Sequence, residues 1–269
     1  IISIFFVLLY IIRYLFYLYC LSRSFIPTKV DKNQVELLKK DYNDKINIEY
    51  IDNNYTKKNN MMVLFKNNNK PSWNDDNIII FFHGIGGWIR DVLEKEMVIE
   101  LSKNNTIIIM DYTGYGINEG NPTEEIINND VINLWNYVTN IKKVPIDNIS
   151  ICGHSLGACL SSNLIKTLLD EKRNIPKKLL LISSFYNFYE ISKEISPFLG
   201  RLNILKFEHN KFLEYINGKI NIIYIHGFKD KMIHFKHSFK LFYETNAKLI
   251  ICEGDHYDMN LNKIRFISN

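Results

Sequence analysis

Short apolar runs alternate with segments of helical period along most of the chain, beginning near residue 46. The later runs are continuous rather than alternating, as expected for strands that helices cover on both faces. The predicted strands are residues 46–51, 61–65, 78–82, 106–110, 149–152, 179–182, 220–225 and 248–252. This order predicts a mostly parallel, doubly wound α/β sheet of eight strands, with functional loops at the strands' carboxyl ends.

Helical patterns fill most of the spaces between these strands. The predicted helices are residues 90–103, 123–140, 158–169 and 235–245. The helix at 123–140 follows Pro122 and has acidic residues in its first turn, which is a typical helix start. No helical pattern separates the first two strands, so we expect an antiparallel hairpin there.

The first 21 residues are almost entirely apolar, and Arg13 is their single charge. About 20 apolar residues span a bilayer as a helix, although a central Arg costs roughly 2.5–3.5 kcal/mol. We expect a transmembrane or signal-anchor helix over residues 1–21, because no small-residue cleavage site follows as it would after a signal peptide. A buried amphipathic helix is the alternative. The basic residues Arg23, Lys29 and Lys32 favour a cytoplasmic domain after the membrane segment.

The length of 269 residues suits one large domain. We therefore divide the remainder into a polar linker, residues 22–45, and one α/β domain, residues 46–269, and expect a monomer. Hydrophobic residues make up 46% of the chain and charged residues 23%, which is the ordinary balance of a protein with a core. The net charge of +4 comes from scattered lysines, so nucleic-acid binding has little support.

Neither a metal nor a cofactor is predicted. The four cysteines, Cys20, Cys152, Cys159 and Cys252, form no CxxC pair and no Cys/His ligand spacing. They are interpreted as reduced thiols, although Cys20 lies just past the apolar segment, where a cysteine can be S-acylated. The glycine-rich residues 83–87 lack the spacing of a phosphate-binding fingerprint.

A G-x-S-x-G motif at residues 153–157 contains a candidate nucleophile. The predicted strand at 149–152 leads directly into Gly153-His154-Ser155-Leu156-Gly157, and a helix of small and apolar residues follows. A G-x-S-x-G turn between strand and helix is tight enough to exclude bulky Cβ groups, and it presents its serine above the sheet. We expect Ser155 to be the nucleophile and the Leu156 N–H to face a developing oxyanion. A glycine-rich structural turn is the alternative.

A second element would complete the oxyanion hole. The strand at 78–82 ends in His83-Gly84-Ile85-Gly86-Gly87, and small residues after the third strand commonly supply the other donor. We assign that donor to the Ile85 N–H. His83 is interpreted as structural, holding the loop through a hydrogen bond.

The serine needs a base, and the base needs an orienting acid. In this arrangement the chain order is Ser, then Asp or Glu, then His. The strand at 220–225 is followed by a turn that carries Asp230, and the strand at 248–252 by a turn that carries His256. We assign Asp230 as the acid and His256 as the base. Asp255 is too close to His256 along the chain to orient its ring easily, and Asp111 precedes the serine.

These motifs resemble the α/β-hydrolase superfamily. The resemblance covers roughly residues 46–260 and includes the loop Asp111-Tyr112-Thr113-Gly114-Tyr115-Gly116, which is similar to the "DYRGYG" loop of that superfamily. The nearest branch resembles membrane-anchored α/β-hydrolase-domain proteins, which include monoacylglycerol and lysophospholipid lipases and protein depalmitoylases. Thr113 stands where Arg is common, and Ile85-Gly86-Gly87 replaces an Asn-Ala-containing loop, so the resemblance leaves the substrate open.

The predicted function is cofactor-independent hydrolysis of ester or thioester bonds in lipid-like substrates. Aromatic residues of an insertion at 183–219 would suit an acyl chain if they lie over the active-site mouth, and packing of helices onto the sheet is the alternative. Two other functions stay open. The same triad could cleave peptides, although no large cap is present to restrict peptide access. A scaffold that has kept the fold is the other, although it has no need for all three triad residues.

Overall fold

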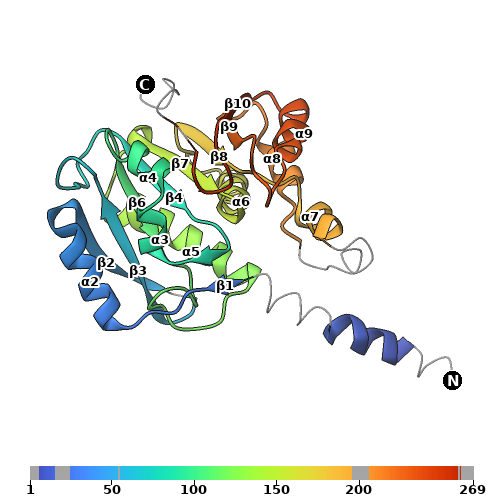
Figure 1. Ribbon diagram of the computed structural model, residues 1–269, viewed down its shortest axis with the longest axis horizontal. Helices are drawn as coiled ribbons and strands as arrows, with labels where there is room; N and C mark the ends of the chain where they lie inside the picture. Colours follow the sequence, from blue (N-terminus) through green and yellow to red (C-terminus); the bar gives the residue numbers. More distant parts are fainter. Residues whose placement is uncertain (1–5, 16–24, 54, 196–205, 260, 262–269) are drawn as a thin grey trace.

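An eight-stranded sheet runs through the centre of the molecule (Figure 1), with the strand order β10-β9-β8-β7-β4-β6-β3-β2. The computed structural model describes residues 6–15, 25–53, 55–195, 206–259 and 261. The strands are β2 (Ile46–Asn53), β3 (Lys58–Phe65), β4 (Ile78–Phe82), β6 (Thr106–Met110), β7 (Ile149–His154), β8 (Lys178–Ile182), β9 (Asn221–Gly227) and β10 (Lys248–Cys252). All eight predicted strands are therefore confirmed, with small shifts at their ends.

The pairing of the strands also follows the prediction. β2 and β3 form an antiparallel hairpin, and β3 pairs antiparallel with β6. The other pairs in this sheet are parallel. The carboxyl ends of β4, β7, β8, β9 and β10 therefore meet at one edge of the sheet, where loops distant in the sequence come together.

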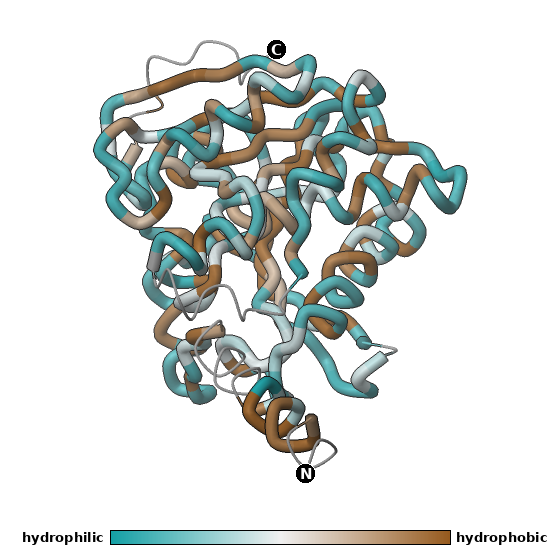
Figure 2. Tube along the Cα trace, turned by 90° about the vertical axis from the view of Figure 1, so that its right-hand side faces the viewer, coloured by the Kyte–Doolittle hydropathy of each residue, from teal (hydrophilic) through white to brown (hydrophobic). Residues whose placement is uncertain are grey.

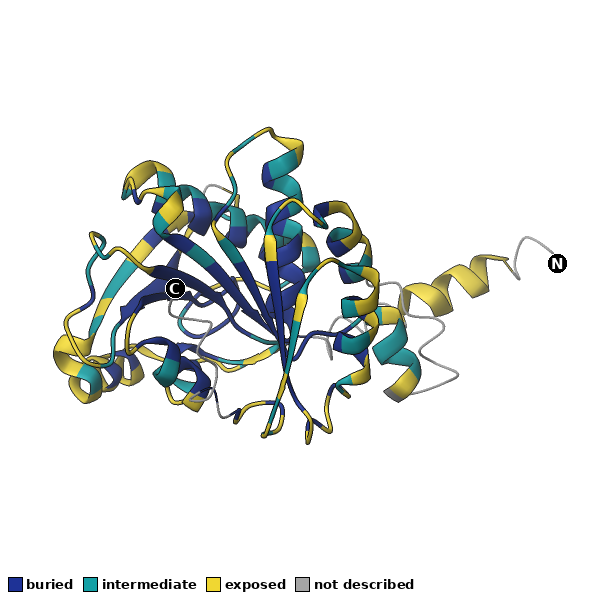
Figure 3. Ribbon diagram, turned by 90° about the horizontal axis from the view of Figure 1, so that it is seen from above, coloured by how far each residue is buried: buried dark blue, intermediate teal, exposed yellow. Residues whose placement is uncertain are grey.

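Helices cover both faces of the sheet, and the side chains of each strand alternate between them. In β4, Ile78, Ile80 and Phe82 enter one apolar cluster, while Ile79 and Phe81 enter the other. Full burial of such a side chain stabilises the fold by about 1.5–3 kcal/mol. The strands are accordingly buried between exposed helical surfaces (Figure 3).

The first cluster is covered by α5 (Glu124–Asn136), α6 (Leu156–Asp170), α8 (His209–Ile216) and α9 (Lys236–Glu244). The second is covered by α2 (Lys32–Tyr42), α3 (Ile89–Leu93) and α4 (Glu96–Leu101). The helix predicted at 90–103 is thus two short helices. They are separated because Lys95 takes an extended backbone, with φ −73° and ψ 133°.

The expected linker, residues 22–45, contains helix α2. Asp31 begins this helix with a capping box, in which its side chain accepts the Gln34 N–H and the Gln34 side chain accepts the Asp31 N–H. Val35 and Leu38 are buried against the second cluster. Just before the helix, strand β1 (Ile26–Pro27) pairs with β5 (Gly86–Gly87) and holds this segment to the loop after β4.

Only part of the predicted membrane segment, residues 6–15, is described. These residues form a helix at the periphery of the molecule with exposed apolar side chains (Figure 2). Across the described ranges, no helix combines the length and apolarity needed to cross a bilayer. The predicted membrane helix over residues 1–21 extends beyond this described helix at both ends. The rest of the segment, including Cys20, lies outside the described residues.

Candidate active site

Ser155 stands on a strained turn between β7 and α6. Its backbone has φ 55° and ψ −116°, a conformation that costs an L-residue of order 1–3 kcal/mol. The turn requires glycine on both sides: a Cβ on Gly153 would collide with the Gly157 carbonyl, and one on Gly157 with the Phe82 carbonyl of β4. The G-x-S-x-G pattern therefore has a steric cause in this chain, and it sets Ser155 at the carboxyl edge of the sheet.

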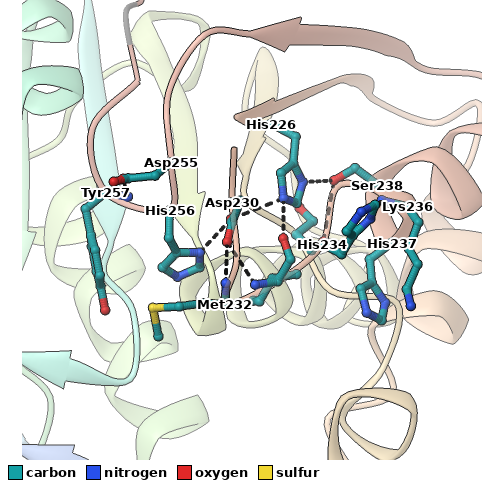
Figure 4. A network of polar contacts seen from close by, with 12 residues as sticks. His226, Asp230, Met232, His234, Lys236, His237, Ser238, Asp255, His256 and Tyr257 are labelled. Atoms are coloured by element: carbon teal, nitrogen blue, oxygen red, sulfur yellow. Dashed lines mark hydrogen bonds and ion pairs between the residues drawn. The ribbon is translucent and has the colours of Figure 1, made fainter. Parts of the chain in front are cut away.

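His256 and Asp230 come together from the loops after β10 and β9. His256 Nδ1 lies 2.7 Å from Asp230 Oδ2, and both side chains are buried (Figure 4). Because a carboxylate only accepts hydrogen bonds, Nδ1 carries the proton, which leaves Nε2 of His256 with a free lone pair. The other carboxylate oxygen, Oδ1, accepts the backbone N–H groups of Met232 and Ile233 at 2.9 Å each.

The electrostatics favour an ionised Asp230. Burial by itself would raise the pKa of this carboxyl, but contacts from His226 and His256 and the Ile233 N–H hold the pKa well below 3.8. Asp255, the other acid near His256, instead accepts the N–H groups of Tyr257 and Asp258 and is exposed. Asp111 lies beside His83, with Oδ1 3.8 Å from its Nε2.

A cavity of about 290 Å³ is lined by both Ser155 and His256. Its other walls come from the loop after β4, from the α3–α4 segment and from the loops after β9 and β10. They include Phe81, Ile85, Asp91, Val92, Lys95, Met97, Met232 and Tyr257. The Lys95 ammonium lies 4.6 Å from the centre of the Tyr257 ring, so the break between α3 and α4 puts a cation on the cavity wall.

The loop after β4, with the predicted oxyanion donor Ile85, is held in place by two tyrosines. Tyr112 donates to the His83 carbonyl at 2.9 Å, and Tyr115 donates to the Ile85 carbonyl at 2.8 Å. An ideal Cβ on Gly84 would lie 3.5 Å from the Ser155 Cβ, so this loop passes directly beside the serine. Leu156, the other predicted donor, is the first residue of α6 and follows Ser155.

Two histidines near the serine have supporting contacts. Burial lowers the pKa of His83 to about 4, and its Nδ1 lies 2.8 Å from the Gly84 carbonyl, as a structural role requires. His154 donates from Nε2 to the backbone carbonyl of His256 at 2.7 Å. The elbow therefore contacts the loop that carries His256. The sequence indicated neither this contact nor the two tyrosines, although the "DYRGYG"-like motif marked the tyrosines' loop.

The described part of the insertion at 183–219 takes one of the two placements that the sequence left open. None of its described residues lines the cavity that Ser155 and His256 share. Phe185 and Phe207 are buried in the first apolar cluster, with Phe188 packed between them. Phe198 and Leu199 lie outside the described residues. Phe185, Phe188 and Phe207 pack helix α7 (Phe188–Ile195) and its flanks onto the domain, as the alternative interpretation of the sequence had it.

No group of three or more His, Cys, Asp or Glu side chains is placed to hold a metal ion within the residues that the structure describes. The site thus consists of a strained serine, a hydrogen-bonded His–Asp pair and a glycine-rich loop.

Comparison with known proteins identifies the family. A family model described as steryl acetyl hydrolase matches residues 2–203, which is more than half of the chain.

The chain belongs to the steryl acetyl hydrolase family. It is a serine hydrolase of the esterase and lipase type, with an α/β-hydrolase fold. The matched residues include Ser155 and the loop after β4, and they end before Asp230 and His256.

Curated relatives are similar over part of the chain. Protein R595 of Acanthamoeba polyphaga mimivirus is 29% identical over 201 residues, which cover 68% of this chain and 68% of that protein. Lysophosphatidylserine lipase ABHD12 of Rattus norvegicus is 32% identical over 118 residues, 43% of this chain but 29% of the lipase.

Solved structures share the fold at low sequence identity. The α/β hydrolase of Vibrio vulnificus has a TM-score of 0.67 at 16% identity, covering 84% of this chain and 81% of that one. Esterase Pf2001 of Pyrococcus furiosus has a TM-score of 0.60 at 13% identity, covering 86% and 90%.

Proposed function

We propose that this enzyme cleaves carboxylic ester or thioester bonds of lipid-like substrates through a Ser155–His256–Asp230 triad and an acyl-enzyme. One observation carries the proposal. The strained serine shares a cavity with a histidine whose other ring nitrogen is bonded to a buried carboxylate at 2.7 Å. This arrangement leaves the His256 Nε2 lone pair available as a general base in the cavity that Ser155 also lines.

The chemistry follows from these groups. Ser155 Oγ attacks the acyl carbonyl carbon while His256 Nε2 takes the hydroxyl proton, and Asp230 stabilises the imidazolium that forms. The N–H groups of Leu156 and Ile85 hold the oxyanion. His256 then returns the proton to the departing alcohol or thiol. A water, deprotonated by His256, attacks the acyl-enzyme. The bond from the acyl carbon to Ser155 Oγ breaks, the acid leaves, and His256 returns the proton to Oγ.

The lipid-like substrate class is favoured by the apolar part of the wall of the cavity that Ser155 lines, which includes Phe81, Val92, Met97 and Met232. The relation to a lysophosphatidylserine lipase is consistent with this class. We therefore expect acyl esters with an apolar acyl group to be better substrates than short peptides.

The test combines labelling with a substrate panel. Wild-type protein and the Ser155→Ala variant are treated with a fluorophosphonate probe and assayed on p-nitrophenyl esters, monoacylglycerols, lysophospholipids and palmitoyl thioesters. Ser161→Ala, which removes a buried hydroxyl on the same helix, is the matched control. We expect Ser155→Ala to lose labelling and several powers of ten in activity, and Ser161→Ala to keep both.

Each other outcome points to a different function. Full activity in Ser155→Ala would refute the proposal. A wild-type protein that takes no label would favour a non-catalytic scaffold, and labelling without release of acyl groups would favour a peptidase.

A further inference from the structure

A second histidine contacts the carboxylate that His256 uses. His226 lies at the end of β9 and is fully buried, and its Nε2 is 3.2 Å from Asp230 Oδ2. This is the same oxygen that His256 Nδ1 contacts from the other side (Figure 4). The general mechanism of the triad does not use His226.

The neighbours of His226 determine where its protons lie. Nε2 faces two acceptors, the Ile233 carbonyl at 2.8 Å and Asp230 Oδ2, so this nitrogen must carry hydrogen. Nδ1 lies 2.7 Å from Ser238 Oγ on α9, and the Ser184 carbonyl lies 3.4 Å from the same oxygen. The shorter contact assigns the serine proton to Nδ1 of a neutral ring. The imidazole therefore presents one N–H between a backbone carbonyl and the catalytic carboxylate.

Every side of the Asp230 carboxylate is then occupied. Oδ1 receives the N–H groups of Met232 and Ile233, and Oδ2 lies between the two imidazole rings. Because a buried carboxylate is strongly stabilised by each donor, the N–H of His226 withdraws negative charge density from the oxygen that His256 needs. It also fixes the position of that oxygen relative to β9.

We propose that His226 is a positioning residue that holds Asp230 and moderates how strongly this carboxylate stabilises the protonated form of His256. The proposal rests on the proposed role of Asp230 in the triad. It predicts a specific signature in the pH profile of kcat/KM.

The sign of the effect follows from electrostatics. Without the His226 N–H, Asp230 Oδ2 bonds only to His256 and stabilises the imidazolium more strongly. The base then stays protonated to a higher pH, so the acidic limb of the kcat/KM profile moves to higher pH. If the substitution merely displaced Asp230, the shift would be opposite, because loss of the carboxylate moves the acidic limb to lower pH.

The chain offers a matched control. His209 is a fully buried histidine that also lies between a serine hydroxyl, Ser162 Oγ at 3.0 Å, and a backbone carbonyl, that of Phe185 at 2.8 Å. Among the described residues, its side-chain hydrogen bonds reach Ser162 and Phe185 and no residue of the proposed triad. Replacing either histidine by Leu removes equivalent buried hydrogen bonds, while Gln keeps an amide N–H donor.

The experiment measures kcat/KM for a p-nitrophenyl ester from pH 5 to pH 10 in full-length variants, with thermal unfolding as the check on folding. For His226→Leu we expect the acidic limb to move to higher pH by about 0.5–1 unit, which lowers kcat/KM at pH 7 by up to about three- to tenfold. His226→Gln should restore most of the activity. His209→Leu should lower the unfolding temperature without moving the limb.

If His226→Leu does not fold, Ser238→Ala decides the question, since it keeps the ring and weakens the N–H donor. It should move the limb upward by less. The proposal is overturned if the folded His226→Leu variant, or otherwise Ser238→Ala, leaves the limb in place or moves it downward. Ser155→Ala, assayed in parallel, distinguishes failure of the His226 proposal from failure of the proposed function. If Ser155→Ala stays active, the proposed function itself fails.

Discussion

The choice of Asp230 over Asp255 as the acid gives the sharpest prediction from the structure. In Asp230→Asn the shape of the side chain is kept and the negative charge is lost. The new amide can present an N–H to His256 Nδ1, where the wild-type protein has a carboxylate oxygen at 2.7 Å. The imidazole then moves its proton to Nε2, the nitrogen that should accept the Ser155 proton, and the base is blocked.

The magnitude follows from what the carboxylate does in the wild-type protein. In the proposed mechanism it selects the correct tautomer, and it stabilises the imidazolium through a short charge-assisted hydrogen bond in a buried site. In a known serine protease triad, the corresponding loss reduces kcat by about 10⁴. We expect a reduction of about 10³–10⁴, or roughly 4–5.5 kcal/mol of transition-state stabilisation.

The assay is kcat/KM for p-nitrophenyl butyrate near pH 8, with Asp255→Asn as the matched control. Asp255 immediately precedes His256, but its carboxylate is exposed and accepts the backbone N–H groups of Tyr257 and Asp258. We expect Asp255→Asn to stay within about threefold of wild type. The reasoning is refuted if Asp230→Asn keeps more than a tenth of the wild-type activity, or if Asp255→Asn loses as much as Asp230→Asn.

Three further predictions concern stability, specificity and pH. Gly157→Ala should lower the free energy of unfolding by about 1–3 kcal/mol, because the alanine Cβ would meet the Phe82 carbonyl. Gly218→Ala, at φ +72° in open space, should cost only about 1 kcal/mol by denaturant titration. Lys95→Met should raise KM for esters with an anionic leaving group by up to about fivefold at low salt, and equal effects on neutral esters would contradict this. Burial lowers the pKa of His209 to about 4 from 6.5, so its stabilisation is present above pH 6.5 and is lost as the pH falls toward 4. His209→Gln should therefore weaken the acid dependence of unfolding by up to about 3 kcal/mol over that range.

Local patterns in the sequence were enough to predict much of this molecule. Continuous apolar runs identified all eight strands of the sheet, since burial on both faces leaves a signal that needs no knowledge of neighbours. The turn around Ser155 was readable for a similar reason. Glycines at 153 and 157 are required by steric contacts within the elbow and with the adjacent strand β4. The order of Ser155, Asp230 and His256 then suggested a triad.

The sequence was less informative wherever distant segments meet. It left the aromatic insertion with two placements, over the active-site mouth or packed onto the sheet, and the described part of the insertion packs into the first apolar cluster. It treated residues 90–103 as one helix, whereas the extended backbone at Lys95 divides the segment and puts this residue on the cavity wall. Apolar periodicity reports which side chains are buried, and it does not report what they are buried against.

The contacts around His256 show the same division. Ser155, Asp230 and His256 could be named from the sequence because each follows a strand that ends at the same edge of the sheet. The contacts of His154 with the His256 backbone and of His226 with Asp230 depend on loops that are close only after the strands have paired. Strand periodicity is a local property of the chain, whereas a hydrogen bond of 2.7 Å depends on the register of several strands at once, and only the folded sheet determines that register.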